Sequence, residues 1–149
     1  MPNFVPLAEL DVWPLSASLR NRMNLFSEEG ALTIVGDDAT DLEKWPNLRN
    51  VLSRIGRIDQ DFEIARGMLD LLHPGAARDW DRPTFQAGLS TLHLPIVSNM
   101  GCMNYAGTES LRLIPGVLYL TNNAVMCSEV NFGQTPRIHL VLEVRKRAE

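Results

Sequence analysis

The sequence contains no apolar run of the roughly 20 residues that a membrane-spanning helix needs. Its first residues, Met-Pro-Asn-Phe-Val-Pro, include neither the basic start nor the apolar stretch of a secretory signal. Cysteine is also scarce, since Cys102 and Cys127 are the only two, and they form neither a CxxC pair nor a disulfide framework. These absences predict a cytoplasmic protein that has no membrane partner and keeps both thiols reduced.

Positive charge is in short supply as well. The chain has 14 Lys and Arg against 18 Asp and Glu, which gives a formal net charge of -4. A nucleic-acid-binding protein usually carries a basic face, and the last basic run here, Arg145 to Arg147, is short and terminal. The composition therefore argues against a nucleic-acid partner. The length of 149 residues fits a single domain, 1–149, with one sizeable core.

Residues 1–60 are expected to form a mainly helical section that packs outside the rest of the domain. Pro14 can open a first helix, because apolar residues recur after it at helical spacing. Ala31–Val35 is a short strand candidate. A second helix is predicted from Leu42 to about Arg54, with Pro46 near its first turn, where the missing N–H of proline is tolerated. Its apolar positions fit one helical face, formed by Leu48, Val51, Leu52 and Ile55.

Residues 61–149 are expected to form a β-barrel core of short apolar strands separated by turn residues. The three predicted strand regions are Leu89–Val97, Leu111–Leu120, which the turn Pro115-Gly116 breaks, and Arg137–Val144. Phe62–Leu72 fits either a strand or a helix. Alternation along the last strand places Arg137 on the face opposite Ile138. Short strands in this arrangement are typical of a small barrel or jelly roll.

Three segments of the second half carry recognisable motifs. Asn122–Val144 has paired Asn residues, an Asn four residues after Cys127, then Arg-Ile-His-Leu and an acidic strand end. Thr91–Asn99 contains His-Leu-Pro, and Leu113–Leu120 contains a Pro-Gly turn before a strand. Together they resemble the aspartyl/asparaginyl β-hydroxylase family of the 2-oxoglutarate oxygenases. The resemblance implies a mainly β fold, the double-stranded β-helix or cupin-like jelly-roll barrel, with the N-terminal helices packed outside.

The resemblance also assigns ligand-binding residues. In that family an Arg of the closing motif pairs with the far carboxylate of 2-oxoglutarate, and this position is Arg137. The His of the earlier strand contacts the cosubstrate, and this position is His93. Thr91 stands where the family has an Arg, so one charge partner is missing. The implied partner of Arg137, His93 and Thr91 is a small molecule that bears a carboxylate.

The metal-binding positions depart from the family's pattern. Cys127 stands where the closing motif has its metal-binding His, and the nearest counterpart of the upstream His-x-Asp motif is Asp79-Trp80-Asp81. If a metal binds, its candidate ligands are Asp79, Asp81 and Cys127. Non-haem iron oxygenases use imidazoles with a carboxylate, whereas a mixture of carboxylates and thiolate has no obvious preferred metal. We therefore expect no metal and no cofactor, with Fe(II) and 2-oxoglutarate as the alternative.

Each candidate residue also has a purely structural interpretation. Arg137 could point to solvent, although its place in an apolar strand favours an inward, anion-binding role. His93 and Cys127 are the candidate catalytic residues, a proton-transfer group and a thiol, but either could be an inert core side chain. Asp79 and Asp81 could belong to a salt-bridged surface loop.

Three functions remain open from the sequence. The first is a metal-independent enzyme that acts on a small carboxylate-bearing substrate by isomerisation, cyclisation or elimination, with His93 as the acid or base and Arg137 as the anchor. The second is an active 2-oxoglutarate-dependent hydroxylase with atypical metal ligands. The third is a non-catalytic binding module that reuses the fold.

Overall fold

The structure is a computed structural model that describes residues 3–28, 30–37, 39–59, 61–81, 89–122 and 124–146, and of residues 80 and 81 only the backbone. Its first half contains β1 (Phe4–Glu9), α1 (Trp13–Arg20), a 3-10 helix (Met23–Leu25), β2 (Ala31–Val35), a second 3-10 helix (Leu42–Lys44) and α2 (Pro46–Ile58). Its second half contains β3 (Phe62–Leu72), β4 (Ala77–Asp81), β5 (Leu89–Val97), β6 (Cys102–Ala106), β7 (Glu109–Leu111), β8 (Val117–Thr121), β9 (Cys127–Asn131) and β10 (Arg137–Lys146).

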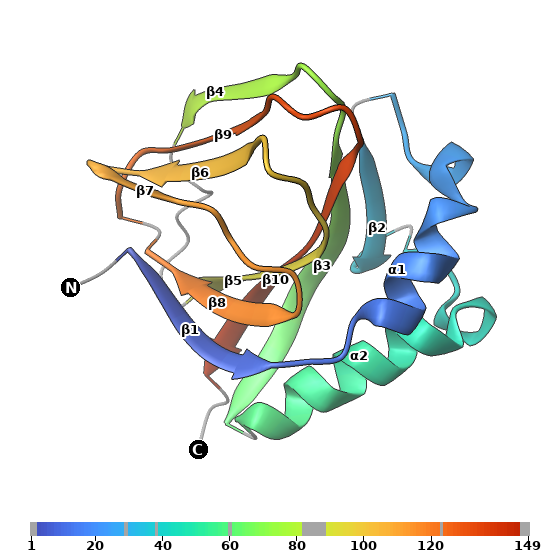
Figure 1. The fold of residues 1–149 in the computed structure, drawn as a ribbon. Coiled ribbons are helices and arrows are strands. Elements are labelled where there is room, and N and C mark those ends of the chain that lie inside the picture. The colour runs from blue at the N-terminus through green and yellow to red at the C-terminus, as the bar shows by residue number, and fades with distance from the viewer. Residues whose placement is uncertain are drawn as a thin grey trace.

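The strands form two sheets that face each other across the interior of a barrel (Figure 1). The larger sheet has the order β1-β8-β5-β10-β3-β2, and the smaller has the order β4-β9-β6-β7. The pairings along both sheets are antiparallel. From β3 to β10 the chain passes repeatedly between the two sheets, and this path winds it into a double-stranded β-helix. The predicted fold class is confirmed.

The main apolar core lies outside the barrel, between the larger sheet and the helices. Leu140 and Leu142 of β10 are 0% exposed and share one apolar cluster with both helices. The helical side of this cluster consists of Leu15 and Leu19 from α1 and of Leu48, Val51, Leu52 and Ile55 from α2. Since side chains alternate across a strand, Arg137 and His139 then face the barrel interior. The helices thus bury the apolar face of the sheet, and polar groups are left inside.

The N-terminal section differs from the prediction in two respects. The strand β1 was not predicted; it pairs with β8 at the edge of the larger sheet, where Pro6 is tolerated because an edge strand can do without one N–H. The helices also have other limits: α1 ends at Arg20, and α2 runs from Pro46 to Ile58. Pro46 fixes the start of α2, because proline fits the first turn of a helix and not its interior.

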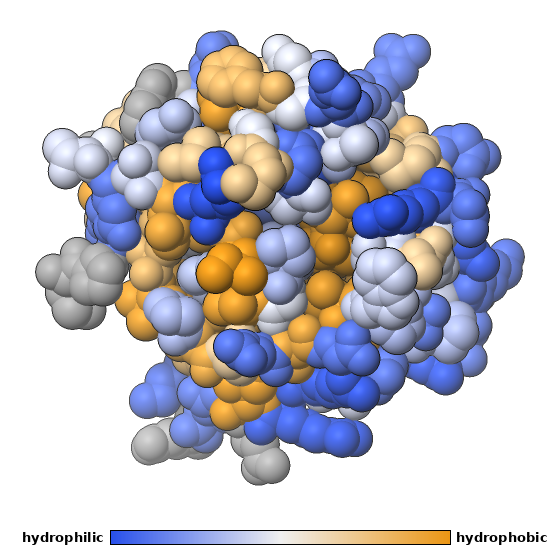
Figure 2. Space-filling model, in the orientation of Figure 1, coloured by the Kyte–Doolittle hydropathy of each residue, from blue (hydrophilic) through white to orange (hydrophobic). Residues whose placement is uncertain are grey.

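The outer surface of the molecule reflects this layering. Hydrophilic side chains cover the helical side on the right of Figure 2, whereas hydrophobic side chains gather over the strands toward the centre. Among the described residues, no helix combines the length and the apolar character that a membrane span requires.

Candidate functional site

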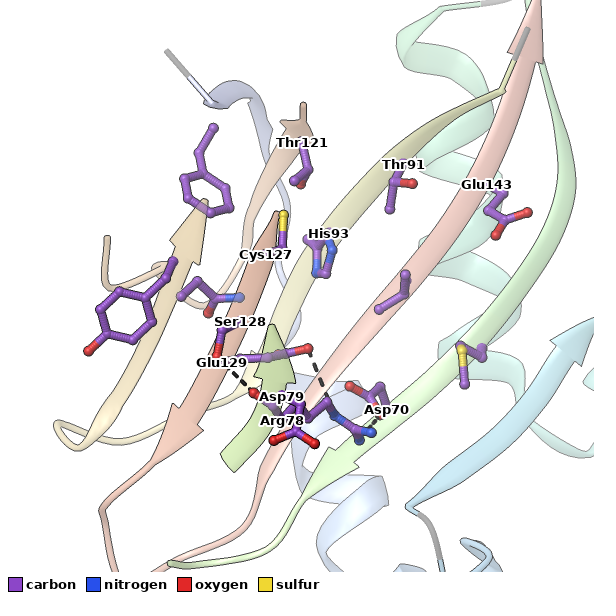
Figure 3. A pocket seen from close by; sticks show the side chains of 15 residues that line it. Asp70, Arg78, Asp79, Thr91, His93, Thr121, Cys127, Ser128, Glu129 and Glu143 are labelled. Carbon is purple, nitrogen blue, oxygen red and sulfur yellow. Dashed lines mark hydrogen bonds and ion pairs between the residues drawn. The ribbon is translucent and has the colours of Figure 1, made fainter. Parts of the chain in front are cut away.

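A cavity of about 430 Å³ lies inside the barrel between the two sheets (Figure 3). The larger sheet supplies Phe4, Met68, Asp70, Thr91, His93, Thr121, Val141 and Glu143 to its wall, and the smaller sheet supplies Arg78, Asp79, Asn104, Tyr105, Cys127, Ser128 and Glu129. Cavities that bind small ligands measure about 300–1,000 Å³, so this one has room for a small molecule. Four of the residues singled out from the sequence, Thr91, His93, Cys127 and Asp79, line it, and Arg137 does not.

Arg137 lies behind the wall that Asp70 and Glu129 form. Its side chain is 1% exposed; Nη2 donates to Oδ2 of Asp70 at 2.8 Å, and Nη1 donates to Oε2 of Glu129. Asp70 comes from β3, the neighbour of β10, whereas Glu129 comes from β9 in the opposite sheet. Burial lowers the pKa of Arg137 to about 10, and the Asp70 carboxylate opposes this shift. The guanidinium therefore stays charged at neutral pH, and two carboxylates of the chain itself hold it.

Arg78 on β4 completes a network of four charged residues, of which Figure 3 shows Asp70, Arg78 and Glu129 at one end of the cavity. Its Nη2 donates to Oδ1 of Asp70 at 2.5 Å, and its Nε lies 3.8 Å from Oε1 of Glu129. The pairing of β4 with β9 places Arg78 directly opposite Glu129. The charges of the two guanidinium groups and the two carboxylates thus cancel, and their contacts link the two sheets.

Two buried histidines lie between this network and the rest of the barrel. His93 on β5 and His139 on β10 make an edge-to-face contact with ring centroids 5.8 Å apart. Burial lowers the pKa of His93 to about 4, and the positive charge of Arg137 adds to the shift. Burial also lowers the pKa of His139 well below its ordinary value. The electrostatic effects of Arg137 and then of His93 add to this shift. Both imidazoles are therefore neutral at pH 7 and contribute hydrogen-bonding groups, not charges.

Three polar atoms on the cavity wall have no hydrogen-bond partner within the described part of the chain. They are Nε of Arg78, Nδ1 of His93 and Oγ1 of Thr121. Each atom is buried, and Thr121 as a whole is only 5% exposed. A buried polar atom without a partner costs about 1–3 kcal/mol, and nearly all such atoms in folded proteins bind protein or water. These three atoms therefore indicate a polar occupant of the cavity.

Cys127 lines the cavity at the start of β9, opposite Ala106 of β6 and Asp81 of β4. Its Sγ donates to the carbonyl of Val125 at 3.6 Å, and burial raises the pKa of the thiol. A raised pKa disfavours the thiolate, which is the form that attacks substrates or binds metals. Asp79 is exposed, and the side chain of Asp81 lies outside the described residues. Among the side chains that are described, no three of His, Cys, Asp or Glu are grouped to hold a metal ion.

A second polar cluster ties down the turn that leads into β10. Asn131 is 0% exposed and donates from Nδ2 to the carbonyls of Leu72 and Thr135, both at 2.9 Å. Its Oδ1 accepts from Nδ2 of Asn99 at 3.1 Å, and the same Asn99 amide donates to the Thr135 carbonyl at 2.8 Å. These bonds link the ends of β3, β5 and β9 to a residue that lies two positions before Arg137. The cluster therefore helps to position the Arg137 side chain.

The sequence did not reveal the carboxylates that hold Arg137. Asp70 lies in Phe62–Leu72, whose pattern fitted a helix as well as a strand, and only the strand β3 brings it to the inward face. Glu129 belongs to the closing motif but has no role in the resemblance. One signal was available: Asp70 is a lone acid in an apolar run, and a buried carboxylate needs a cationic partner.

Comparison with known proteins shows the fold of this chain. No family model and no curated protein matches it. It is similar in structure to an oxidoreductase of the 2OG-Fe(II) oxygenase family from Burkholderia pseudomallei, with a TM-score of 0.68 and 12% identity over 97% of this chain and 85% of that chain. AviO1 from Streptomyces viridochromogenes gives a TM-score of 0.67 and 13% identity over 98% of this chain and 90% of its own. A Pseudomonas putida prolyl-4-hydroxylase gives a TM-score of 0.60 and 15% identity over 98% of this chain and 94% of its own.

These likenesses establish that the chain has the double-stranded β-helix of the 2OG-Fe(II) oxygenases. The side chains that the structure describes at this site fit neither iron nor 2-oxoglutarate. An iron site needs imidazole ligands, yet a thiol stands at the Cys127 position, and the interior His93 and His139 adjoin the cationic Arg137. The terminal nitrogens of Arg137 are engaged by Asp70 and Glu129. No reaction step through iron or 2-oxoglutarate follows from this donor set.

Proposed function

We propose that this chain binds a small polar molecule inside its barrel and does so without iron-dependent oxygenation. One observation carries the proposal: Nε of Arg78, Nδ1 of His93 and Oγ1 of Thr121 belong to residues that line the same cavity, and they have no hydrogen-bond partner among the described residues. An occupant that binds these three atoms would remove an unfavourable contribution of about 1–3 kcal/mol for each. The cavity volume of about 430 Å³ sets the size of that occupant.

The motifs support an origin near the aspartyl/asparaginyl β-hydroxylases. Thr91–Asn99 includes most of β5, and Asn122–Val144 includes β9 and most of β10, which are three of the strands that line the cavity. Within these segments the departures from the family fall at Cys127, where an imidazole ligand would stand, and at Thr91, where an Arg would stand. A barrel that kept the fold and the cavity while losing metal ligands accounts for both the likeness and the departure.

Proton transfer is the chemistry that this site could perform without a metal. His93 lines the cavity, and its pKa of about 4 leaves it neutral at pH 7, so it is a weak base there. Isomerisation, cyclisation or elimination of a carboxylate-bearing substrate stays a prediction. Such a substrate would have to displace Asp70 or Glu129 from Arg137. Binding needs no such exchange, and it is therefore the function that we propose.

The test begins with elemental analysis and a 2-oxoglutarate turnover assay on the purified full-length chain. We expect sub-stoichiometric iron and no consumption of 2-oxoglutarate, because no three His, Cys, Asp or Glu side chains of the described residues are grouped to hold a metal ion. Stoichiometric iron together with turnover would overturn the proposal in favour of an active hydroxylase. A thermal-shift screen of small polar metabolites then identifies ligands. Thr121→Val should weaken the binding of a true cavity ligand and leave surface binders unaffected.

A further inference from the structure

The guanidinium of Arg137 is engaged by the chain itself in the way that a ligand carboxylate would engage it. An arginine binds a carboxylate best through two parallel N–H bonds from its planar fork. Here Nη1 is taken by Glu129 and Nη2 by Asp70, and the whole residue is 0% exposed. A ligand carboxylate can therefore reach the two terminal nitrogens only by displacing one of these side chains, while the buried Nε has no hydrogen-bond partner among the described residues.

We propose that Glu129 is a specificity-determining residue, an internal stand-in for a ligand carboxylate that keeps dicarboxylates such as 2-oxoglutarate out of the cavity. The ligand is then an uncharged polar molecule. This inference rests on the proposed function in one respect, namely that the cavity is the binding site.

The charges around the cavity support an uncharged ligand. Asp70 and Glu129 are neutralised by Arg78 and Arg137, and Glu143 pairs with Arg66 at 2.6 Å. Among the described lining residues the only cation is Arg78, which is already paired with Asp70. An anion that entered would lose its hydration without gaining a free counter-charge, and this loss is costly in a buried site.

The unpartnered atoms support a hydroxylated ligand. Nε of Arg78 can only donate, whereas Oγ1 of Thr121 both donates and accepts, and Nδ1 of neutral His93 does one or the other according to its tautomer. A hydroxyl group satisfies all three kinds of atom, because it can donate and accept at once. The occupant that fits these atoms is therefore a neutral molecule with several hydroxyl groups.

Glu129 is the better position for a test, because it lies on the boundary between Arg137 and the cavity. It lines the cavity from the smaller sheet, and its side chain is 17% exposed against 11% for Asp70. Without Glu129, the Asp70 carboxylate would face two guanidinium groups alone, with one positive charge in excess. The space that Glu129 vacates would be continuous with the cavity. Removing this one side chain should therefore create a carboxylate-binding site.

The experiment measures binding of 2-oxoglutarate and succinate by calorimetry to wild type and to Glu129→Ala. We expect no measurable binding to wild type at millimolar ligand, and at least about a tenfold tighter Kd for the variant, since charge-assisted hydrogen bonds to a guanidinium are the strong ones. Adding Arg137→Met to Glu129→Ala should abolish the gain. Glu143→Ala is the matched control: it removes a carboxylate from the same cavity wall but away from Arg137, and it should gain nothing.

If Glu129→Ala folds poorly, a second substitution at position 129 still tests whether carboxylates bind there. Glu129→Ser also removes the charge and vacates the space, and acetate or formate should raise the melting temperature of either variant saturably and not that of Glu143→Ala. The inference is overturned if wild type binds 2-oxoglutarate as tightly as Glu129→Ala, or if neither Glu129 variant responds to any of these carboxylates. Its failure is distinguishable from failure of the proposed function, which is decided by iron content, by 2-oxoglutarate turnover and by Thr121→Val.

Discussion

The guanidinium of Arg137 and the carboxylate of Asp70 meet at 2.8 Å on adjacent strands, where Arg137 is 0% and Asp70 7% exposed. The same carboxylate accepts a bond from Arg78, and Glu129 bridges toward both arginines. The four residues come from β3 and β10 of the larger sheet and from β4 and β9 of the smaller one. The network is therefore a polar cross-link between the two sheets of the barrel.

Removing Asp70 should destabilise the fold strongly. Asp70→Ala leaves Arg137 buried with one fewer counter-charge, and breaking a buried ion pair from one side costs about 3–5 kcal/mol. Urea unfolding measures the change. Glu63→Ala is the control, since Glu63 and Arg145 form an exposed pair at 3.9 Å, whose loss should cost less than about 1 kcal/mol. Equal effects of the two substitutions would contradict the role assigned to the network.

Thr121→Val should leave stability unchanged or raise it. The Thr121 hydroxyl is buried without a partner among the described residues, so replacing it with a methyl group of similar shape removes an unsatisfied group. Ser128→Ala serves as the comparison, because the Ser128 hydroxyl donates to the carbonyl of Arg78 at 2.7 Å and its loss should cost about 1 kcal/mol. Thermal unfolding of both variants decides the matter: a clear loss of stability in Thr121→Val would mean that its hydroxyl is bonded after all.

The stability of the fold should fall as the pH is lowered from about 6.5 toward 4. Both His93 and His139 have folded-state pKa values below the ordinary 6.5, so in this range the unfolded chain binds more protons than the folded one. Protonation therefore favours unfolding, and His93 alone accounts for a loss on the order of 3 kcal/mol.

Chemical unfolding at several pH values tests this dependence. His93→Phe should flatten the curve between pH 6.5 and 4, because it removes the group whose pKa differs between the two states. His73→Gln changes a histidine that is exposed, and it should leave the curve as in wild type. A wild-type protein whose stability is constant over this range would show that the two buried imidazoles do not have lowered pKa values.

Asn131→Ala should disrupt the turn before β10. The substitution removes the side-chain amide donor of the Leu72 carbonyl and leaves the Thr135 carbonyl with the Asn99 amide alone. A buried acceptor that loses its donor costs about 1–3 kcal/mol. The control is Asn47→Ala, which removes an exposed amide that donates to the Pro14 carbonyl at 3.4 Å and should change stability little. Hydrogen exchange at β10 adds a local readout, since faster exchange near Arg137 is expected only if Asn131 positions it. Unchanged exchange there would contradict the positioning role.

The alternation of side chains along strands and the burial of the apolar face of a helix were enough to predict much of the fold. Alternation from Arg137 to Val144 separated the polar residues from the apolar ones, because a strand sends neighbouring side chains to opposite faces. The apolar spacing of Leu48, Val51, Leu52 and Ile55 predicted the packing face of α2, and all four are buried. The short strands β1, β4, β6 and β9 were not predicted individually, since five or six residues carry too little pattern to be separated from loop.

The features of the candidate site also fall into those that the sequence determined and those that only the tertiary structure decided. The sequence by itself determined that Arg137 and His93 belong to the barrel strands and that no imidazole stands at position 127, because these facts depend on local pattern and residue identity. Only the tertiary structure decided that Asp70 and Glu129 hold Arg137, because they lie 67 and 8 positions away along the chain and on strands of two different sheets. Pairing between charges depends on distance in space, and strand order, not sequence spacing, sets that distance.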